Sequence, residues 1–286
     1  MIVYDRESGN LIDELEYQKR LLGFLYETLF GRVLLKTLVA RPWVSKVQGR
    51  YYNSKRSKRK VEPFIDKYGI DISHWDIDDF KCFNDFFRRK KEVDFDETLN
   101  HFISVADSKL LVYDISKDLK FKVKNAIYDI EDIVQSKEIA EKYENGYCLV
   151  FRLGVNDYHR YIYADNGTVE SNYRIKGVLH TVRPISEKYH AFSRNSREIS
   201  LLKTETMGDV VQIEVGALLV GAIRNNHSES FSKGDEKGYF EYGGSTIILL
   251  VENDVVDIDN DILENSKKGI ETKVTIGEKI GVVKGV

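Results

Sequence analysis

The feature that most constrains the fold is a change of pattern near residue 100. Beyond it the chain breaks into short runs rich in β-branched residues and separated by Gly, Asn or Asp, such as KLLVYDI, FKVKNAI, CLVFRL, DVVQIEV and STIILLVE. Runs of this kind are typical of strands in an antiparallel sheet. We therefore expect residues 96–286 to form an antiparallel β-rich body, built like a sandwich.

The residues before this body carry helical patterns. LIDELEYQKRLLGFLYETLF repeats apolar residues at spacings of three and four, VEPFIDKYG has proline near its start and glycine at its end, and FKCFNDFFRRK carries a stripe of phenylalanines. We expect the first ninety or so residues to be helical, and residues 1–95 to form a region that packs on the body. One further helix is expected at DIEDIVQSKEIAEKY. The predicted fold class is α+β.

Several classes of protein lack support in the sequence. Cys82 and Cys148 lie far apart and form no CxxC or Cys/His spacing, so neither a disulfide framework nor a metal site is expected. The N-terminus carries charges of both signs where a signal peptide needs a basic start and an apolar run. No GxGxxG, P-loop or GxSxG occurs. The expected setting is reduced and cytoplasmic.

One stretch suggests contact with a surface of lipid. Residues 21–40, LLGFLYETLFGRVLLKTLVA, are apolar but are interrupted by Glu27, Arg32 and Lys36, which argues against a bilayer-spanning helix. The next twenty residues, RPWVSKVQGRYYNSKRSKRK, contain many Lys and Arg, no acid and three interleaved aromatics. Anionic lipid suits this pattern. Nucleic acid and a simple solvated helix face are alternatives on pattern alone.

The most unusual local sequence is EYGGSTIILL, residues 241–250, where two glycines and a Ser-Thr pair directly precede an aliphatic run. A turn before a strand is the plain interpretation. Two other segments carry reactive residue types. Asp157-Tyr158-His159-Arg160 follows a predicted strand, and Asp107 lies at a break between two apolar runs. Because a lone histidine is more often structural than catalytic, local pattern alone does not decide their role.

Taken together, these segments resemble the phosphatidylserine decarboxylase proenzyme family. The similar elements are FNDFFRR at 83–89 (family FNxFFxR), Ala106-Asp107, DYHR at 157–160, NSRE at 195–198 (NxRE), VGALLVG at 215–221 (VGAxxVG), and KGDEKGYF at 233–240 with the GGST that follows. Their order and spacing make the resemblance specific. It covers about residue 80 to the end of the sequence.

The resemblance implies that the chain cuts itself between Gly244 and Ser245. Ser245 would attack the carbonyl of Gly244 and form an ester, and elimination would then leave a β chain of residues 1–244 and an α chain of residues 245–286. The new N-terminus would carry a pyruvoyl group made from Ser245. A glycine before the bond exposes the carbonyl and tolerates a strained backbone, while serine needs a base to react. The pyruvoyl ketone does the work of a carbonyl cofactor, so no external cofactor and no metal is expected.

The resemblance also implies the reaction and the roles of the site residues. The chain is expected to convert phosphatidylserine to phosphatidylethanolamine and CO2 as a peripheral protein on the cytoplasmic side of the cell membrane. Ser245 would be the nucleophile and pyruvoyl precursor, Asp107 an orienting acid, and His159 a base or proton donor. Expected partners are phosphatidylserine, an anionic membrane surface, and the two chains of one precursor, with no nucleic acid. The oligomeric state is open, a homodimer being one alternative.

The sequence departs from the family pattern at Ile162. The motif commonly continues DYHRxH, and the second histidine is the one usually assigned, with the aspartate and the serine, to self-cleavage. Isoleucine at this position leaves three outcomes: His159 serves both steps, another group such as His180 or His190 substitutes, or the chain no longer matures. The last outcome would give a non-cleaving lipid-binding relative. A pyruvoyl-dependent decarboxylase of a soluble amino acid is the other alternative.

Overall fold

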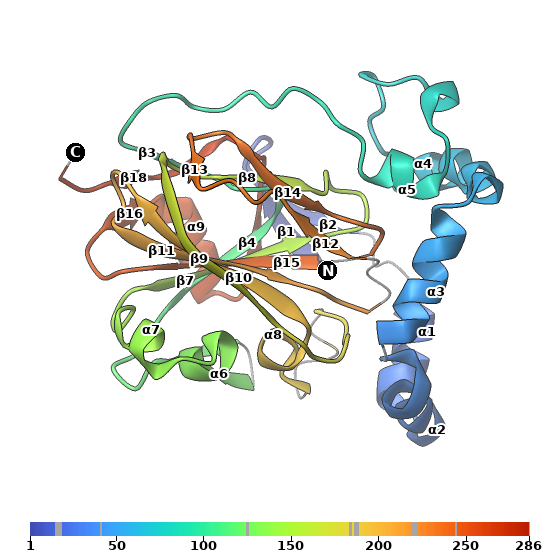
Figure 1. Cartoon of the computed structure of the whole chain (residues 1–286), viewed down its shortest axis with the longest axis horizontal. Helices are drawn as coiled ribbons and strands as arrows, with labels where there is room; N and C mark the ends of the chain where they lie inside the picture. Colours follow the sequence, from blue (N-terminus) through green and yellow to red (C-terminus); the bar gives the residue numbers. More distant parts are fainter. Residues whose placement is uncertain are drawn as a thin grey trace.

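One large sheet organises the chain in this computed structural model, which describes residues 1–14, 19–40, 42–123, 126–182, 185, 189–218, 222–243 and 245–285. Figure 1 shows the sheet running through the molecule, with smaller sheets on one side and short helices on the other. In spatial order its strands are β13 (Ser230–Phe231), β9 (Gly167–Ile175), β10 (Arg197–Thr204), β11 (Asp209–Val215), β15 (Ser245–Val251), β7 (Tyr147–Leu153), β4 (Ser108–Asp114), β17 (Glu271–Val274), β1 (Ile2–Asp5) and β2 (Asn10–Asp13). Neighbouring strands are antiparallel except β1 and β17.

Two three-stranded sheets cover one face of the large sheet. They are β12 (Ile223–Asn225), β14 (Glu236–Phe240) and β8 (Arg160–Ile162), and β16 (Val256–Ile258), β18 (Lys279–Val283) and β3 (His101–Ile103). Side chains of both layers are buried together: Phe151 and Ile247 from the large sheet meet Tyr161 and Phe240 from the smaller one. This arrangement confirms the α+β, sandwich-like fold predicted from the sequence.

The opposite face of the large sheet is covered by a hairpin and three short helices. These are β5 (Lys120–Val123), β6 (Ala126–Asp129), α6 (Ile130–Val134), α7 (Lys137–Glu141) and α8 (Ala191–Arg194). Their apolar side chains pack on Ile248 and Leu250. Ile247 and Leu249 point the other way, into the core between the large sheet and the two small sheets. Because β15 is buried on both faces, its continuous aliphatic run follows directly from its central position. A further helix, α9 (Asn260–Lys267), lies against β4, where Val112 N donates to Ser266 Oγ at 2.9 Å.

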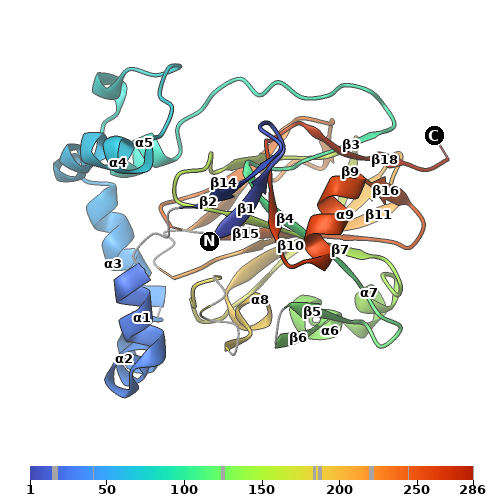
Figure 2. The same ribbon diagram turned by 180° about the vertical axis from the view of Figure 1, so that it is seen from behind.

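The helices of residues 19–87, here called the helical arm, project from one side of the body (Figures 1 and 2). They are α1 (Lys19–Glu27), α2 (Leu29–Leu34), a π-helix (Leu35–Val39), α3 (Pro42–Tyr52), a 3₁₀ turn (Lys55–Lys60), α4 (Val61–Tyr68), a 3₁₀ turn (Ile77–Asp79) and α5 (Phe83–Phe87). Helix α4 ends as the sequence predicted, at Gly69, whose φ of 58° favours glycine. An aromatic core of the arm, centred on Phe83 and Phe86, joins it to Tyr242 of the body.

Two expectations about helices are wrong. Residues 2–5 and 10–13 form a hairpin rather than helix, because a turn at Gly9 (φ 67°) lets the chain fold back and Val3 becomes fully buried beside β17. The single helix expected at residues 129–143 is two helices, since Gln135 adopts φ 55° and Ser136 caps α7. The division into two domains at residue 95 stays a prediction.

Candidate functional site

Ser245 opens β15, at one end of the large sheet. Its Cα pairs with Leu153 of β7, and Thr246 pairs with Val215 of β11, so central strands flank it on both sides. The side chain is 0% exposed, and its Oγ has no hydrogen-bond partner among the described residues. The hydroxyl of the neighbouring Thr246 is in the same state, so two unpartnered hydroxyls stand at the start of β15. Gly244, the other half of the expected cleavage site, lies outside the described residues.

The backbone before Ser245 is held in an unusual conformation. Gly243 is buried with φ 138°, which side-chain-bearing residues rarely adopt. One residue earlier, Tyr242 N donates to Asn84 Oδ1 of α5 at 3.1 Å. The helical arm therefore fixes the path of the chain that leads into the GGST sequence.

His159 is fully buried and carries its proton on a known nitrogen. Nδ1 lies 2.8 Å from the carbonyl oxygen of Asp157, and because a carbonyl only accepts, Nδ1 is the donor. Nε2 then presents a lone pair, and no described residue bonds to it. Burial lowers the pKa of His159 to about 3, an effect only partly offset by the hydrogen bond to the backbone of Asp157 and, more weakly, by the nearby backbone of Gly243. The influence of Gly243 places the imidazole beside the segment that precedes Ser245.

Aromatic rings from the arm cover this imidazole. The ring of Phe87 lies 4.0 Å from that of His159 and 5.1 Å from that of Tyr242. Tyr52 of α3 extends the cluster, with its ring 4.4 Å from that of Tyr242. The cluster excludes water from His159, which is the physical origin of its low pKa.

Asp107 lies at the same end of the sheet as Ser245. It directly precedes β4, whose Lys109 pairs with Arg152, and Arg152 pairs in turn with Thr246. Two strand spacings therefore separate Asp107 from the Ser245 strand. Its Oδ1 accepts from Ile276 N at 2.8 Å. Within the described part of the chain no hydrogen bond joins Asp107 to His159 or Ser245, so the three residues share one end of the sheet without forming a bonded triad.

A buried ion cluster fixes the segment that carries His159. Lys109, 4% exposed, donates to both carboxylate oxygens of Asp157, at 2.7 and 2.8 Å, and lies 2.9 Å from Glu14. Arg152 joins Glu14 (2.7 Å) to Glu271 (2.8 Å). Although burial opposes the shift, the charges of Arg152 and Lys109 lower the pKa of Glu14 to about 2. The cluster thereby holds Asp157, whose carbonyl orients the imidazole.

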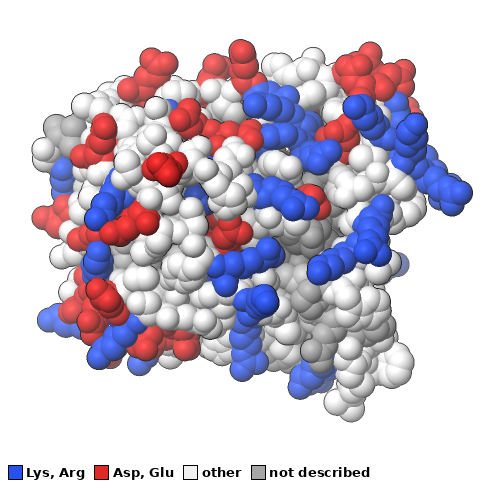
Figure 3. All heavy atoms as spheres, viewed as in Figure 1, with Lys and Arg blue, Asp and Glu red and all other residues white. Residues whose placement is uncertain are grey.

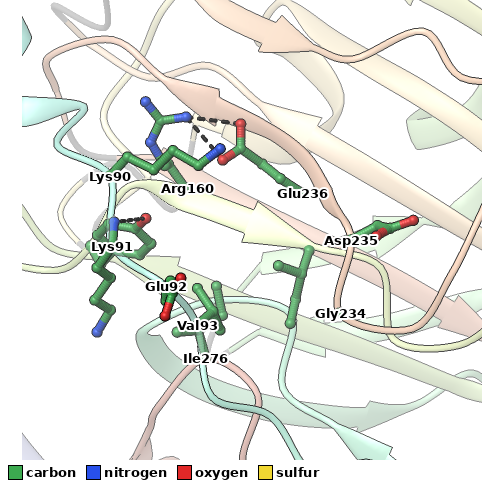
Figure 4. Close-up of a pocket in the computed structure, with 11 residues that line it drawn as sticks. Lys90, Lys91, Glu92, Val93, Arg160, Gly234, Asp235, Glu236 and Ile276 are labelled. Atoms are coloured by element: carbon green, nitrogen blue, oxygen red, sulfur yellow. Dashed lines mark hydrogen bonds and ion pairs between the residues drawn. The ribbon is translucent and has the colours of Figure 1, made fainter.

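Ile162 lies in an apolar cluster beside the backbone that leads to Asp107, since its N donates to Val105 O at 3.0 Å and Ile276, which bonds to Asp107, belongs to the same cluster. Along β8 the side chains alternate, so Tyr161 enters the core between the sheets while Ile162 packs with Ile103, Tyr158 and Ile276 on the other side. There it lines a pocket of about 500 Å³, which Figure 4 shows. The other residues that line this pocket are Lys90, Lys91, Glu92, Val93, Tyr158, Arg160, Gly234, Asp235, Glu236 and Ile276. Isoleucine at this position completes an apolar cluster and contributes nothing polar to the space around His159.

The two candidate replacement histidines lie apart from His159. His180 is at the Ser245 end of the sheet, because Asn195 bonds both to the backbone of His180 and to the carbonyl of Gly216, which directly follows β11. The ring of His180 is turned to the arm, where its Nδ1 lies 3.3 Å from the hydroxyl of Tyr26 in α1. His190 packs against Tyr128, 5.4 Å between ring centroids, in the core on the opposite face of the sheet. Among the described residues, neither ring makes a hydrogen bond or ring contact with Ser245 or His159.

Sequence reasoning missed three charged residues of the site: Glu14, Lys109 and Arg89. The pairing of Glu14 and Lys109 with Arg152 and Asp157 joins residues more than forty positions apart, so no local pattern signals it. Arg89 did carry a signal, because it ends the FNDFFRR element.

A second candidate surface lies on the helical arm. Apolar side chains of α1 to α3 are exposed there: Leu29 (79%), Phe30 (71%), Val33 (60%), Val47 (56%), Trp43 (54%), Leu21 (44%) and Phe24 (41%). Figure 3 shows Lys and Arg side chains gathered on the same side of the molecule as the arm. Among the described residues, none of the helices is both long and apolar enough to span a bilayer.

Comparison with known proteins gives consistent similarities. The family model for phosphatidylserine decarboxylase matches residues 80–282. The chain is 48% identical over 283 residues to phosphatidylserine decarboxylase proenzyme 2 of Clostridium acetobutylicum, covering 98% of this chain and 97% of that protein. It is 39% identical to a phosphatidylserine decarboxylase proenzyme of Clostridium beijerinckii (98% of each chain) and 38% identical to one of Desulfitobacterium hafniense (98% and 97%).

Proposed function

The chain belongs to the phosphatidylserine decarboxylase family, and on this premise we propose that it is a self-processing carboxy-lyase that converts phosphatidylserine to phosphatidylethanolamine and CO2. The observation that carries the proposal for its own residues is a pair of buried, unpartnered atoms. Ser245 Oγ and His159 Nε2 are a nucleophile and a base, and both lie where the GGST segment enters the sheet. Buried polar atoms without partners are rare in folded proteins, and here a nucleophile and a base are both in that state.

Self-cleavage starts at Ser245. Nε2 of His159 removes the hydroxyl proton, and Oγ attacks the carbonyl carbon of Gly244. The same proton passes from Nε2 to the departing Ser245 nitrogen, so the C–N peptide bond breaks and an ester C–O bond remains. Elimination then removes the Cα proton of Ser245 and breaks its Cβ–Oγ bond, which releases the Gly244 carboxylate and leaves a Cα=Cβ double bond beside the free amine. Addition of water and loss of ammonia leave a pyruvoyl group at the head of β15. The unpartnered Ser245 Oγ and the glycine-rich approach fit the formation of this group.

His159 serves as the base for cleavage and as the proton carrier in decarboxylation. Its neutral state and defined tautomer leave Nε2 ready to accept a proton, which both roles require as their first step. Asp107, anchored by Ile276 N at the same end of the sheet, supplies the negative charge that favours the imidazolium while it exists.

The pyruvoyl carbonyl supplies the electron sink for loss of CO2. The surrounding residues transfer the proton and exclude water. Nε2 of His159 takes up a proton that the substrate ammonium loses on reacting with the ketone, and returns it to the carbon that has lost CO2. The rings of Phe87, Tyr52 and Tyr242 exclude water from the reacting carbon.

The chain docks on the cytoplasmic side of the cell membrane through the helical arm. The exposed Leu29, Phe30 and Trp43 enter the apolar boundary of the lipid, while neighbouring Lys and Arg meet anionic headgroups. The aromatic cluster that includes Tyr52 links the arm to the segment before Ser245, so the surface that meets lipid is continuous with the site.

Release of CO2 from vesicles tests the function. Wild-type protein is mixed with vesicles containing phosphatidylserine, and the CO2 and phosphatidylethanolamine formed are measured, with Ser245→Ala as the control. Equal formation of both products by the wild type and none by the variant is expected. Release of CO2 from free serine but not from the lipid would contradict the assigned substrate.

A further inference from the structure

Arg89 is a buried arginine whose side chain lacks a partner. It is 6% exposed, and no hydrogen bond or ion pair joins its guanidinium to any described residue; its Nε is fully enclosed without an acceptor. The guanidinium instead lies over two aromatic faces, 5.3 Å from the ring centre of Trp75 and 5.1 Å from that of Phe86. Trp75 is itself fixed, because its Nε1 donates to the carbonyl of Lys90 at 2.8 Å.

Other buried arginines show what a satisfied guanidinium looks like in this fold. Arg197 donates to the backbone carbonyls of Ile133, Asp132, Ser193 and Asn195. Arg152 is held between two carboxylates. A buried charge without such partners is strongly destabilising, so Arg89 has a reason other than folding to be where it is.

The position of Arg89 points to the active site. It follows Phe87, whose ring packs on His159, by two residues. Its charge lowers the pKa of His159, and the carboxylates of Asp107 and Asp157 act on it in return. Burial lowers its own pKa, but a guanidinium stays protonated at any physiological pH. The site therefore contains a fixed positive charge that acidic residues influence from a distance but that makes no hydrogen bond or ion pair within the described chain.

We propose that Arg89 binds the phosphodiester of the lipid substrate. The inference rests on the proposed function and adds to it the residue that recognises the headgroup. A planar guanidinium can donate two parallel hydrogen bonds to two oxygens of one phosphate. The contacts with the rings of Trp75 and Phe86 restrict the orientation of this guanidinium.

The substrate offers a second anion, its carboxylate, which chemistry excludes as the partner of Arg89. The carboxylate leaves as neutral CO2, so an ion pair to it would stabilise the ground state more than the transition state and slow the reaction. The phosphodiester keeps its charge throughout, so binding it positions the substrate without that penalty.

The test compares Arg89→Gln with Arg88→Gln, a matched change at the neighbouring arginine, which is 35% exposed and pairs with Asp85. Intact mass first reports whether each variant cuts itself. Kinetics with dihexanoyl phosphatidylserine then give KM and kcat, and dihexanoyl phosphatidylethanolamine, which has the phosphodiester and no carboxylate, gives an inhibition constant. Calorimetric binding of the same phosphatidylethanolamine to the uncut Ser245→Ala chain, with and without Arg89→Gln, repeats the comparison without any need for cleavage.

Arg89→Gln is expected to raise KM and to weaken phosphatidylethanolamine binding by the same factor, about tenfold to a hundredfold, with a smaller change in kcat. Arg89→Lys should lie between it and the wild type, and Arg88→Gln should match the wild type. A raised KM with unchanged phosphatidylethanolamine binding would assign Arg89 to the carboxylate and overturn the proposal. So would unchanged KM, or a loss confined to self-cleavage. If the wild type failed to cut, the proposed function would fall, and the binding comparison on the uncut chain would still decide the role of Arg89.

Discussion

The imidazole of His159 donates from Nδ1 to the carbonyl oxygen of Asp157 at 2.8 Å, and this bond fixes which ring nitrogen can act as a base. Nε2, left without a partner among the described residues, is the reactive position. Replacement of His159 by Gln should therefore slow self-cleavage by about 10²- to 10⁴-fold, the usual contribution of a general base. The amount of uncut chain over time, measured by intact mass, checks this. Cleavage at the wild-type rate would remove His159 from the mechanism.

Introduction of the family's second histidine should bring no gain. Ile162 packs in the apolar cluster with Ile103 and Ile276. Ile162→His would bury a polar ring among apolar side chains, which typically costs about 1–3 kcal/mol of stability. We expect a lower melting temperature and an unchanged cleavage rate. A variant that cuts many times faster would show that this position does reach the reacting atoms.

The pH dependence should follow the low pKa of His159. Because that pKa is about 3 rather than the ordinary 6.5, the base stays neutral and the cleavage rate should be flat between about pH 5 and pH 8. The unfolded chain takes up a proton below about pH 6.5 while the folded chain does not, so this residue's contribution to stability is lost as the pH falls through that window. His159→Gln should lessen the drop in unfolding free energy by up to about 1.4 kcal/mol per pH unit there. A cleavage rate that falls near pH 6.5 would indicate a solvated histidine instead.

Lys109 should act through Asp157. Lys109→Met leaves the carboxylates of Asp157 and Glu14 buried without their shared cation, an imbalance that costs about 3–5 kcal/mol in comparable clusters. Both the unfolding free energy and the cleavage rate should fall, and Lys109→Arg should restore part of each. If stability fell while the surviving folded protein cut at the full rate, Lys109 would have no part in positioning His159.

The arm should carry membrane binding. The paired change Leu29→Asp and Phe30→Asp removes the two most exposed apolar side chains of α2 and adds negative charge. Partition onto phosphatidylserine vesicles, measured by sedimentation, should fall at least about tenfold, since each buried apolar side chain contributes about 1.5–3 kcal/mol. Ile127→Asp is the control, because Ile127 is comparably exposed (56%) but lies on β6, outside the arm. Equal loss in both variants would mean that charge, not the arm, decides binding.

Local sequence pattern predicts those helices and strands whose burial or end signals are visible in their own residues. The aliphatic run after Ser245 reads as a strand because β15 is buried on both faces, and VEPFIDKYG reads as a helix because its Gly69 cap is local. Strand β9 was missed, since its sequence GTVESNYRI is mostly polar and its pairing with β10 alone makes it a strand. The N-terminal hairpin escaped for the same reason: β1 depends on β17, nearly 270 residues away.

In the candidate site, too, the sequence predicts some features and leaves others hidden. Ser245, His159 and Asp107 stand in recognisable motifs and gather at one end of the sheet. The contacts that set their chemistry are tertiary: Phe87 against His159, Lys109 on Asp157, and the guanidinium of Arg89 between two rings. The position of Ile162 within an apolar cluster also depends on the register of β8 and cannot be read from the sequence.

The intact mass of the purified, denatured protein tests the central claim most directly, with Ser245→Ala as the control. We expect two chains from the wild type, residues 1–244 and 245–286, the smaller one lighter by one ammonia than simple hydrolysis of the bond gives, and a single uncut chain from the variant. The missing ammonia is the signature of a pyruvoyl group formed from Ser245. A wild-type chain that stays whole after prolonged incubation, or two fragments with the mass of plain hydrolysis, would contradict the self-processing mechanism.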